Sequence, residues 1–290
     1  MEKAPEFCIL CGCRDREVLL EKDSWQVYRC SSCGLGLLDP RPSKEDLASL
    51  YSKQYCDEHF VGGGDPGSPE FRKRLSLETP RIRFFRGIKK RGKVLDIGCG
   101  YGYFLAACSN YGYEVQGLDI SEWASHHAAK KLGIPIDIGP INEMKFPPHC
   151  FDIITMWHFL EHTPDPRNAI LRARDWLKGD GILIVDVPNH EGTDARNNWK
   201  EWVGWDLPYH FFHFTPQTLK GLLTECGFRV VKKKDYHSET VKVALKRIPV
   251  VSIFARLISK MYSGHSIAVV ARREEKPAPL SKRGDLNKLV

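Results

Sequence analysis

Four cysteines form two pairs whose spacing suits metal binding. Cys8 and Cys11 make one Cys-x-x-Cys turn, Cys30 and Cys33 make a second, and 18 residues separate the two pairs. Each turn brings two thiolates to one point, and two turns complete the tetrahedral shell that Zn²⁺ prefers. Cys13 lies close by, but the Cys-x-x-Cys spacing favours Cys11 as the ligand. A site of four thiolates has no open position for catalysis, so we expect a structural zinc ribbon.

A glycine-rich loop indicates nucleotide chemistry. Gly98, Gly100 and Gly102 follow a short apolar segment, and glycines there let the backbone turn sharply and approach a ligand closely. Asp96 precedes the loop, and Asp119 follows about 20 residues later, where a carboxylate meets ribose hydroxyls in dinucleotide-binding folds. The alternative is a structural turn with a capping acid. We favour nucleoside binding, and the lack of a third glycine at the dinucleotide position argues against NAD.

Several segments of the chain resemble the motifs of the class I S-adenosylmethionine-dependent methyltransferases. They are residues 94–104 (first motif), 117–121 (ribose-binding second motif), 151–162 (fourth motif, ending in Leu-Glu-His) and 179–185 (fifth strand). The resemblance covers about residues 90–232 and 265–272. The cysteine pairs and Pro40-Arg-Pro resemble the corresponding residues of a subgroup that includes sugar C-methyltransferases of antibiotic and surface-polysaccharide pathways.

The resemblance implies S-adenosyl-L-methionine as cofactor and assigns roles to individual residues. Gly98 and Gly100 would pass its methionine part, Asp96 would order the loop and the amino group, and Asp119 would take the ribose hydroxyls. Related proteins often have an acid after the third strand, where this chain has Pro140-Ile-Asn. Adenine would therefore be held by backbone groups there. The implied cofactor-binding residues are Asp96, Gly98, Gly100, Gly102, Asp119, Ile120, Ile141 and Asn142.

Histidines after the fourth expected strand are the first candidates for a general base. In open α/β sheets the active site lies beyond the carboxyl ends of the strands. His158 is the nearest candidate, and Glu161 is placed to orient a histidine. We favour His158 over His162 as the base, because a histidine titrates near pH 7 and His158 lies nearer the expected methyl group. The alternative is local capping around the turn at Thr163.

A second cluster of chemically capable residues follows the fifth expected strand. Residues 199–214 hold three tryptophans together with Tyr209, His210 and His213. Aromatic loop residues of this kind can wall a dry substrate pocket. We predict that Tyr209 and His210 contact the acceptor and donate, accept or remove a proton. The alternative is an aromatic core beneath a lid, and both interpretations can hold together.

Alternating strands and helices must position these residues. Apolar runs predict strands at 94–97, 114–119, 135–138, 151–157, 182–187, 228–231 and 266–270. Helices follow four of them, with Ser121, Asp165 and Thr215 as start signals and Gly133 and Gly227 as stop signals. This alternation predicts an α/β fold: a doubly wound, mostly parallel, seven-stranded Rossmann-like sheet with a small N-terminal zinc ribbon.

Changes in composition along the chain suggest its division into parts. We expect a zinc-ribbon module at 1–60, a linker at 61–80, a methyltransferase domain at 81–273 with an insertion at 240–263, and a loose tail at 274–290. The insertion is apolar and basic, so it could lie on a membrane surface or cover a lipid-linked acceptor. We favour a helix packed on the domain or a dimer contact, because Pro249 interrupts the pattern.

Composition limits the class of partner. The 290 residues carry 43 Lys and Arg against 36 Asp and Glu, a net charge of +7, and 42% are apolar. This balance excludes a disordered chain, and no apolar run is long enough to span a membrane. The polar N-terminus predicts a cytoplasmic location. The mild charge makes nucleic acid a weaker partner than a small molecule. The sequence does not specify an oligomeric state.

These observations predict a methyltransferase that uses S-adenosyl-L-methionine and a His or Tyr base on a small-molecule acceptor. A sugar nucleotide or another metabolite is the expected acceptor. One alternative is an RNA methyltransferase guided by the ribbon, which the residues Met156-Trp-His158 disfavour because base-amine enzymes use an Asn/Asp-Pro-Pro-Tyr motif. Another is a non-catalytic cofactor-binding protein, against which the intact glycine loop argues.

Overall fold

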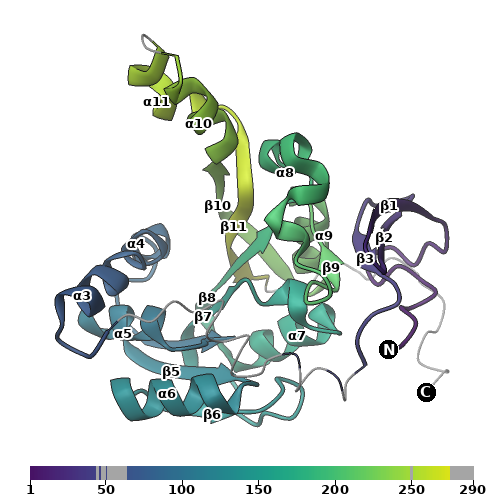
Figure 1. The fold of residues 1–290 in the computed structure, drawn as a ribbon. Coiled ribbons are helices and arrows are strands. Elements are labelled where there is room, and N and C mark those ends of the chain that lie inside the picture. The colour runs from purple at the N-terminus through teal and green to yellow at the C-terminus, as the bar shows by residue number, and fades with distance from the viewer. Residues whose placement is uncertain (44–45, 47–49, 51–63, 249–250, 275–290) are drawn as a thin grey trace. The chain divides into compact units, whose positions relative to one another are not determined.

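The computed structural model describes residues 1–43, 46, 50, 64–248 and 251–274 (Figure 1). Residues 61–63 of the expected linker and 275–290 of the expected tail lie outside this range. The chain forms two compact units. One contains Met1 and residues 42–186, and the other contains residues 2–41 and 187–290.

The central sheet has seven strands in the order β10-β11-β8-β7-β4-β5-β6. Its parallel strands are β4 (Lys93–Ile97), β5 (Glu114–Asp119), β6 (Ile136–Ile138), β7 (Phe151–Trp157) and β8 (Leu177–Pro188). Registers such as Asp96 opposite Gly117 and Thr155 place the carboxyl ends of β4, β5 and β7 at one edge. The fold class expected from the sequence is confirmed.

Helices of the first unit precede the central sheet or connect its strands. They are α3 (Pro69–Ser76), α4 (Thr79–Arg86), α5 (Tyr103–Asn110), α6 (Glu122–Leu132) and α7 (Pro166–Trp176), and η1 (Leu160–His162) follows β7. Side-chain caps fix their starts, since Ser121 accepts from the Ala124 N–H and Asp165 from the Asn168 N–H. α3 lies within the range expected to be a linker.

A four-stranded antiparallel sheet, in the order β1-β2-β3-β9, belongs to the second unit. Its strands are β1 (Arg16–Lys22), β2 (Trp25–Cys30), β3 (Gly36–Leu38) and β9 (Phe212–His213). Gly36 pairs with His213 and Leu37 with Phe212. The expected ribbon therefore receives its fourth strand from a segment more than 170 residues away in sequence.

The rest of the second unit contains helices and an antiparallel strand pair. The helical elements are α8 (Thr193–Asn198), η2 (Trp199–Glu201), η3 (Val203–Trp205), α9 (Pro216–Glu225), α10 (Glu239–Lys246), η4 (Val251–Phe254) and α11 (Ala255–Ser259). β10 (Phe228–His237) and β11 (Ser263–Arg273) pair antiparallel on either side of α10 and α11. In the described part of the chain, none of the helices combines the length and apolar character that a bilayer-spanning helix requires.

Candidate active site

The glycine loop lies between β4 and α5, as expected. Gly98, Gly100 and Gly102 have φ values of 77°, 51° and 73°, which side chains rarely adopt. A Cβ added at Gly98 would lie 2.9 Å from the Phe159 ring, and one added at Gly102 would lie 3.0 Å from Ala128 Cβ. Glycine is therefore required at Gly98 and Gly102 both for backbone conformation and for space, and at Gly100 for backbone conformation.

Asp119 connects the glycine loop to the next βα turn. At the end of β5, its Oδ2 accepts from the Gly100 N–H at 2.7 Å and its Oδ1 accepts from the Ser121 N–H at 2.8 Å. Burial raises the pKa of Asp119, while these N–H groups act in the opposite direction. Each carboxylate oxygen retains a second lone pair. The group can therefore hold the loop and still accept hydrogen bonds from two further hydroxyls.

Asp96 lies beneath the loop in a nearly dry position. Its side chain is 3% exposed, and the Thr155 hydroxyl on β7 donates to its Oδ1 at 2.5 Å. Burial raises the pKa of Asp96 to about 7, although the Thr155 hydrogen bond lowers it. A cation next to Asp96 would restore the ionised form.

The residues assigned to adenine follow the neighbouring strands. Ile120 is 37% exposed directly after Asp119. The Gly139 N–H donates to the Asp119 carbonyl at 2.9 Å, which connects the end of β6 to the end of β5. Ile141 is buried and Asn142 is exposed just beyond this connection. The loops after β4, β5 and β6 thus bring together the residues expected to hold one nucleoside.

His158 begins the loop after β7 and has a carboxylate partner. Its Nδ1 lies 3.2 Å from Oε1 of Glu161, which is fully buried, and its own side chain is 34% exposed. Its φ of 52° is a left-handed conformation, and its N–H donates to the Asp186 carbonyl. Burial lowers the pKa of His158, but the charges of Asp186 and Glu161 outweigh this effect, so the net shift is upward.

The aromatic residues of the second unit surround Trp205. Its ring is 1% exposed and lies 5.0 Å from the His213 ring and 5.3 Å from those of Trp199 and Trp202. Burial lowers the pKa of His190 to about 4 and that of His213 well below its usual value. Both imidazoles are therefore neutral near pH 7.

Three polar atoms of this aromatic cluster are buried without a hydrogen-bond partner among the described residues. They are His190 Nε2, His213 Nε2 and Trp202 Nε1. Such groups each cost about 1–3 kcal/mol unless a partner satisfies them. His210 is different, because its Nδ1 lies 2.9 Å from the Gly204 carbonyl and its Nε2 lies 3.5 Å from Asp206. Tyr209 is half-buried beside it.

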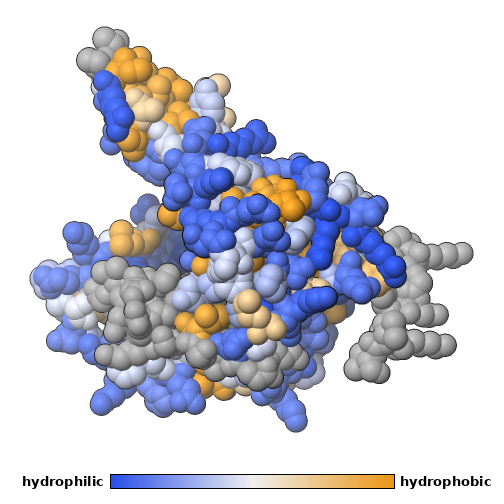
Figure 2. Space-filling model, turned by 45° about the vertical axis from the view of Figure 1, so that its right-hand side comes forward, coloured by the Kyte–Doolittle hydropathy of each residue, from blue (hydrophilic) through white to orange (hydrophobic). Residues whose placement is uncertain are grey.

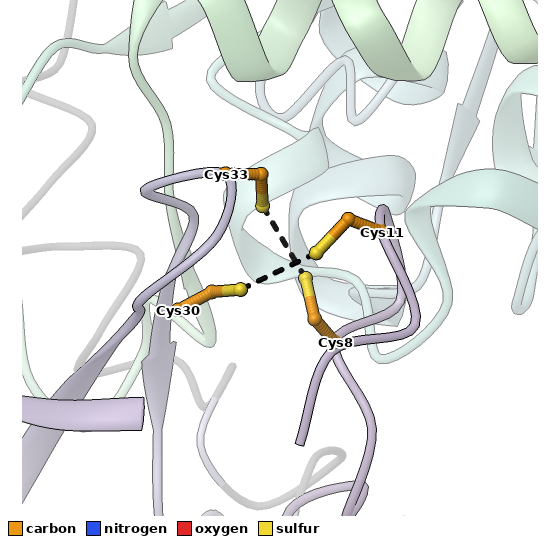
Figure 3. A group of neighbouring side chains, drawn as sticks. All are labelled: Cys8, Cys11, Cys30 and Cys33. Atoms are coloured by element: carbon orange, nitrogen blue, oxygen red, sulfur yellow. Dashed lines mark hydrogen bonds between the residues drawn. The ribbon is translucent and has the colours of Figure 1, made fainter. Parts of the chain in front are cut away.

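The four predicted metal ligands come together in the ribbon (Figure 3). All four sulfur atoms lie within 4.8 Å of one another, with Cys8 3.5 Å from Cys33 and Cys11 3.3 Å from Cys30. Zn–S bonds of about 2.3 Å in a tetrahedron separate the sulfurs by about 3.8 Å. The spacing and the donor set both fit Zn²⁺.

The two cysteine turns have the same backbone form. The Gly12 N–H donates to the Cys8 carbonyl at 2.8 Å, and the Gly34 N–H donates to the Cys30 carbonyl at 2.9 Å. Both glycines have positive φ, of 69° and 81°. The repeated turn explains why each Cys-x-x-Cys pair is followed by glycine. A small hollow of about 20 Å³ lies beside Cys8 and Cys30, lined by Phe7, Tyr28 and Phe212.

Comparison with known proteins identifies the family. The family model of a methyltransferase domain matches residues 70–233, more than half of the chain. The chain belongs to the class I S-adenosylmethionine-dependent methyltransferases. The matched segment contains the glycine loop, Asp119 and His158, so this part of the methyltransferase carries the family likeness.

Curated relatives of this chain include ubiquinone biosynthesis O-methyltransferases. A ubiquinone biosynthesis O-methyltransferase of Histophilus somni is 33% identical over 140 residues, covering 43% of this chain and 58% of the relative. One from Coxiella burnetii is 35% identical over 125 residues, covering 40% and 53%. The chain thus spans little more than half the length of these relatives.

A solved structure shows the same fold. A SAM-dependent methyltransferase from Archaeoglobus fulgidus has a TM-score of 0.54 and 24% identity, covering 69% of this chain and 94% of the other.

Some residues of the methyltransferase site were not found from its sequence. Thr155 donates to Asp96 from the middle of an apolar strand, and Phe159 covers Gly98. Asp186 acts on His158 from the end of β8. His190 is buried against Trp205. The only sequence signal for Thr155 and Asp186 is polar character at a strand position, which does not specify a partner, and Phe159 and His190 lie in loops that follow strands.

Proposed function

We propose that this chain transfers the methyl group of S-adenosyl-L-methionine to a small-molecule acceptor that carries a dissociable proton. The observation that supports this most is the Asp119 carboxylate, which joins the glycine loop to the β5 end and keeps lone pairs for ribose hydroxyls. When bound, the sulfonium cofactor supplies a methyl group that is already electrophilic. The protein then has to align the acceptor and remove its proton.

The proposed cofactor residues lie in three loops, and each loop would contact a different part of the cofactor. Gly98, Gly100 and Gly102 leave the backbone free of Cβ atoms where the methionine part would pass. Asp96 would face the amino group, whose positive charge would favour its ionised form. Ile120, Ile141 and Asn142 would hold adenine through an apolar face and backbone groups.

The proposed base is His158, oriented by Glu161. A buried carboxylate on Nδ1 fixes the tautomer so that Nε2 is the proton acceptor, and it stabilises the imidazolium that forms. Tyr209 and His210 are proposed to contact the acceptor. A sugar nucleotide is our preferred acceptor class.

The proposed ribbon site holds one structural Zn²⁺ through Cys8, Cys11, Cys30 and Cys33. Four thiolates leave no open position, so the ion would supply stability and no chemistry. The ribbon sheet includes β9, so this stability would extend to His213 and to the aromatic cluster that precedes it.

Calorimetry with S-adenosylhomocysteine tests the cofactor assignment. Asp119→Ala should weaken binding at least tenfold, because about two charge-assisted hydrogen bonds to ribose are lost. Asp137→Ala is the matched control: it removes a carboxylate from the neighbouring strand β6, where Asp137 accepts from Gln116. Circular dichroism checks that both variants fold. Equal affinity in Asp119→Ala and the parent protein would contradict the ribose role.

A further inference from the structure

A helical arm interrupts the β10–β11 pair at residues 239–262. It contains α10, η4 and α11, and its base is tied at both ends, because the Ser238 N–H donates to the carbonyls of Ser259 and Tyr262. Asp194 on α8 accepts from the hydroxyls of Ser238 and Thr240 at 2.5 and 2.6 Å. The start of α10 is therefore anchored within its own unit, and the arm extends from a fixed base.

The outer face of the arm is apolar. Ala255 and Ser259, four residues apart on α11, are 1% and 0% exposed and form its inner face. The exposed large apolar residues are Val243 (49%), Ile248 (49%), Ile253 (79%), Phe254 (55%), Leu257 (65%), Met261 (82%) and Tyr262 (44%). Figure 2 shows this gathering of hydrophobic side chains at the end of the arm. A contiguous patch of this kind marks an interaction surface.

Positive charge accompanies this apolar patch. Residues 239–262 contain five Lys and Arg and one acid, Glu239, which pairs with Lys242 at 2.9 Å. The other four cations are Lys246, Arg247, Arg256 and Lys260, and none has a carboxylate within 4 Å in the described part of the chain. Arg256 and Lys260 directly precede Leu257 and Met261. All four of these cationic side chains are exposed, whereas Ala255 and Ser259 are buried, so both cationic and apolar side chains lie on the exposed side of the arm.

We infer that the arm lies on the surface of an anionic lipid bilayer, with Ile253, Phe254, Leu257 and Met261 entering the boundary between headgroups and acyl chains. An apolar face flanked by Lys and Arg is the composition that binds such an interface. A second copy of the chain fits less well, because a two-fold contact would set four unpaired cations of one copy against four of the other. The arm thus places the whole enzyme at a membrane.

Vesicle co-sedimentation of the full chain tests this inference. Vesicles of phosphatidylcholine with phosphatidylglycerol should bind the protein, and vesicles of phosphatidylcholine alone should bind it far less. Leu257→Gln with Met261→Gln leaves the charge unchanged and should weaken binding at least about tenfold, because two side chains no longer enter the bilayer. Arg256→Gln with Lys260→Gln should weaken it about thirtyfold, and added salt should have the same effect.

Control variants test whether vesicle binding depends on the arm or on exposed apolar and cationic residues anywhere on the surface. Leu171→Gln and Val203→Gln change exposed apolar residues elsewhere, and Arg83→Gln with Lys90→Gln removes two cations elsewhere. All of these should bind vesicles as the parent does. Calorimetry with S-adenosylhomocysteine should be unchanged in every variant, which separates this surface from the proposed methyl transfer. Vesicle binding that survives Leu257→Gln with Met261→Gln would overturn the inference. The inference would also be overturned if the protein does not bind vesicles and instead self-associates in sedimentation velocity.

Discussion

At the residue scale, Asp96 holds a carboxyl group that is 3% exposed at the end of β4, with a pKa raised to about 7 by burial. Its pKa in the unfolded chain is near 3.8. The folded protein therefore binds this proton more tightly, and ionisation of Asp96 costs stability as pH rises from about 4 to about 7. We predict that Asp96→Asn raises the melting temperature at pH 8, since the Asn oxygen still accepts from Thr155. The gain is at most roughly 4 kcal/mol.

The same substitution should weaken cofactor binding. If Asp96 faces the amino group, Asp96→Asn removes a charge-assisted contact, and calorimetry with S-adenosylhomocysteine at pH 8 should show weaker affinity. Below about pH 3 the stability difference should become small, because Asp96 is then mostly protonated in both the folded and the unfolded state. A variant that is less stable than the parent at pH 8 would contradict the burial argument.

The His158–Glu161 pair gives a second prediction at this scale. The pKa of His158 is raised, with burial opposing the shift and the charges of Asp186 and Glu161 causing it. Glu161→Gln removes one of these charges, so the pKa of His158 should fall. Its imidazole would then stay neutral to lower pH, and the acid limb of a pH–rate profile would move in the same direction. NMR titration of the imidazole, assigned by its absence in His158→Gln, measures the shift without a known acceptor.

His127 provides an internal reference for this titration, because it lies on α6 and its pKa is lowered by burial and by the charge of Lys131 rather than by Glu161. The pKa of His127 should be the same in the parent and in Glu161→Gln. A His158 pKa that stays constant or rises in Glu161→Gln would mean that Glu161 does not act on it as a negative charge.

At the scale of elements, the ribbon sheet depends on a close approach between β3 and β9. A Cβ added at Gly36 would lie 2.7 Å from His213 Cβ, closer than real contacts allow. Gly36→Ala should therefore push β9 away from β3 and expose its backbone amides. Hydrogen exchange at residues 211–214 should become faster by at least about tenfold, which corresponds to about 1.4 kcal/mol.

Gly179→Ala is the control for this substitution, because Gly179 also lies in a strand but a Cβ there meets nothing within 4 Å. Exchange at 211–214 should be the same in Gly179→Ala as in the parent. Unchanged exchange in Gly36→Ala would show that β9 does not depend on this contact.

The elements also show how far sequence can predict this structure. Strands β4, β5 and β7 and the caps Ser121, Asp165 and Thr215 were predictable because local apolar runs and capping side chains determine them. β8 begins at Leu177, five residues before the predicted start, because Phe151 pairs with Leu177 across a bulge that no local pattern encodes. The two-residue strand β9 was not predicted, since its partner lies in the ribbon. The hydrogen bond between Thr155 and Asp96 was likewise not predicted, because it depends on the register in which β4 pairs with β7.

At the scale of the whole molecule, the chain divides into one unit that contains the glycine loop and another that contains the ribbon. A structural Zn²⁺ typically supplies about 10–16 kcal/mol of binding free energy to a small module. The ribbon has few large buried side chains of its own, among them Leu20, Val27 and Leu38. We predict that a chelator unfolds the ribbon. Hydrogen exchange should then lose protection in β1, β2, β3 and β9 and keep it in β4, β5 and β7.

Cofactor uptake should partly survive this treatment, because Asp96, the glycine loop and Asp119 belong to the other unit. Calorimetry with S-adenosylhomocysteine after chelation should therefore still show binding, whereas methyl transfer should fall as the aromatic cluster next to β9 loses its support. Metal analysis of the untreated protein should give one zinc per chain, and Cys11→Ser should reproduce the effect of the chelator. Loss of all cofactor binding on chelation would show that the two units do not fold independently. If metal analysis finds no zinc in the untreated protein, zinc does not stabilise the ribbon.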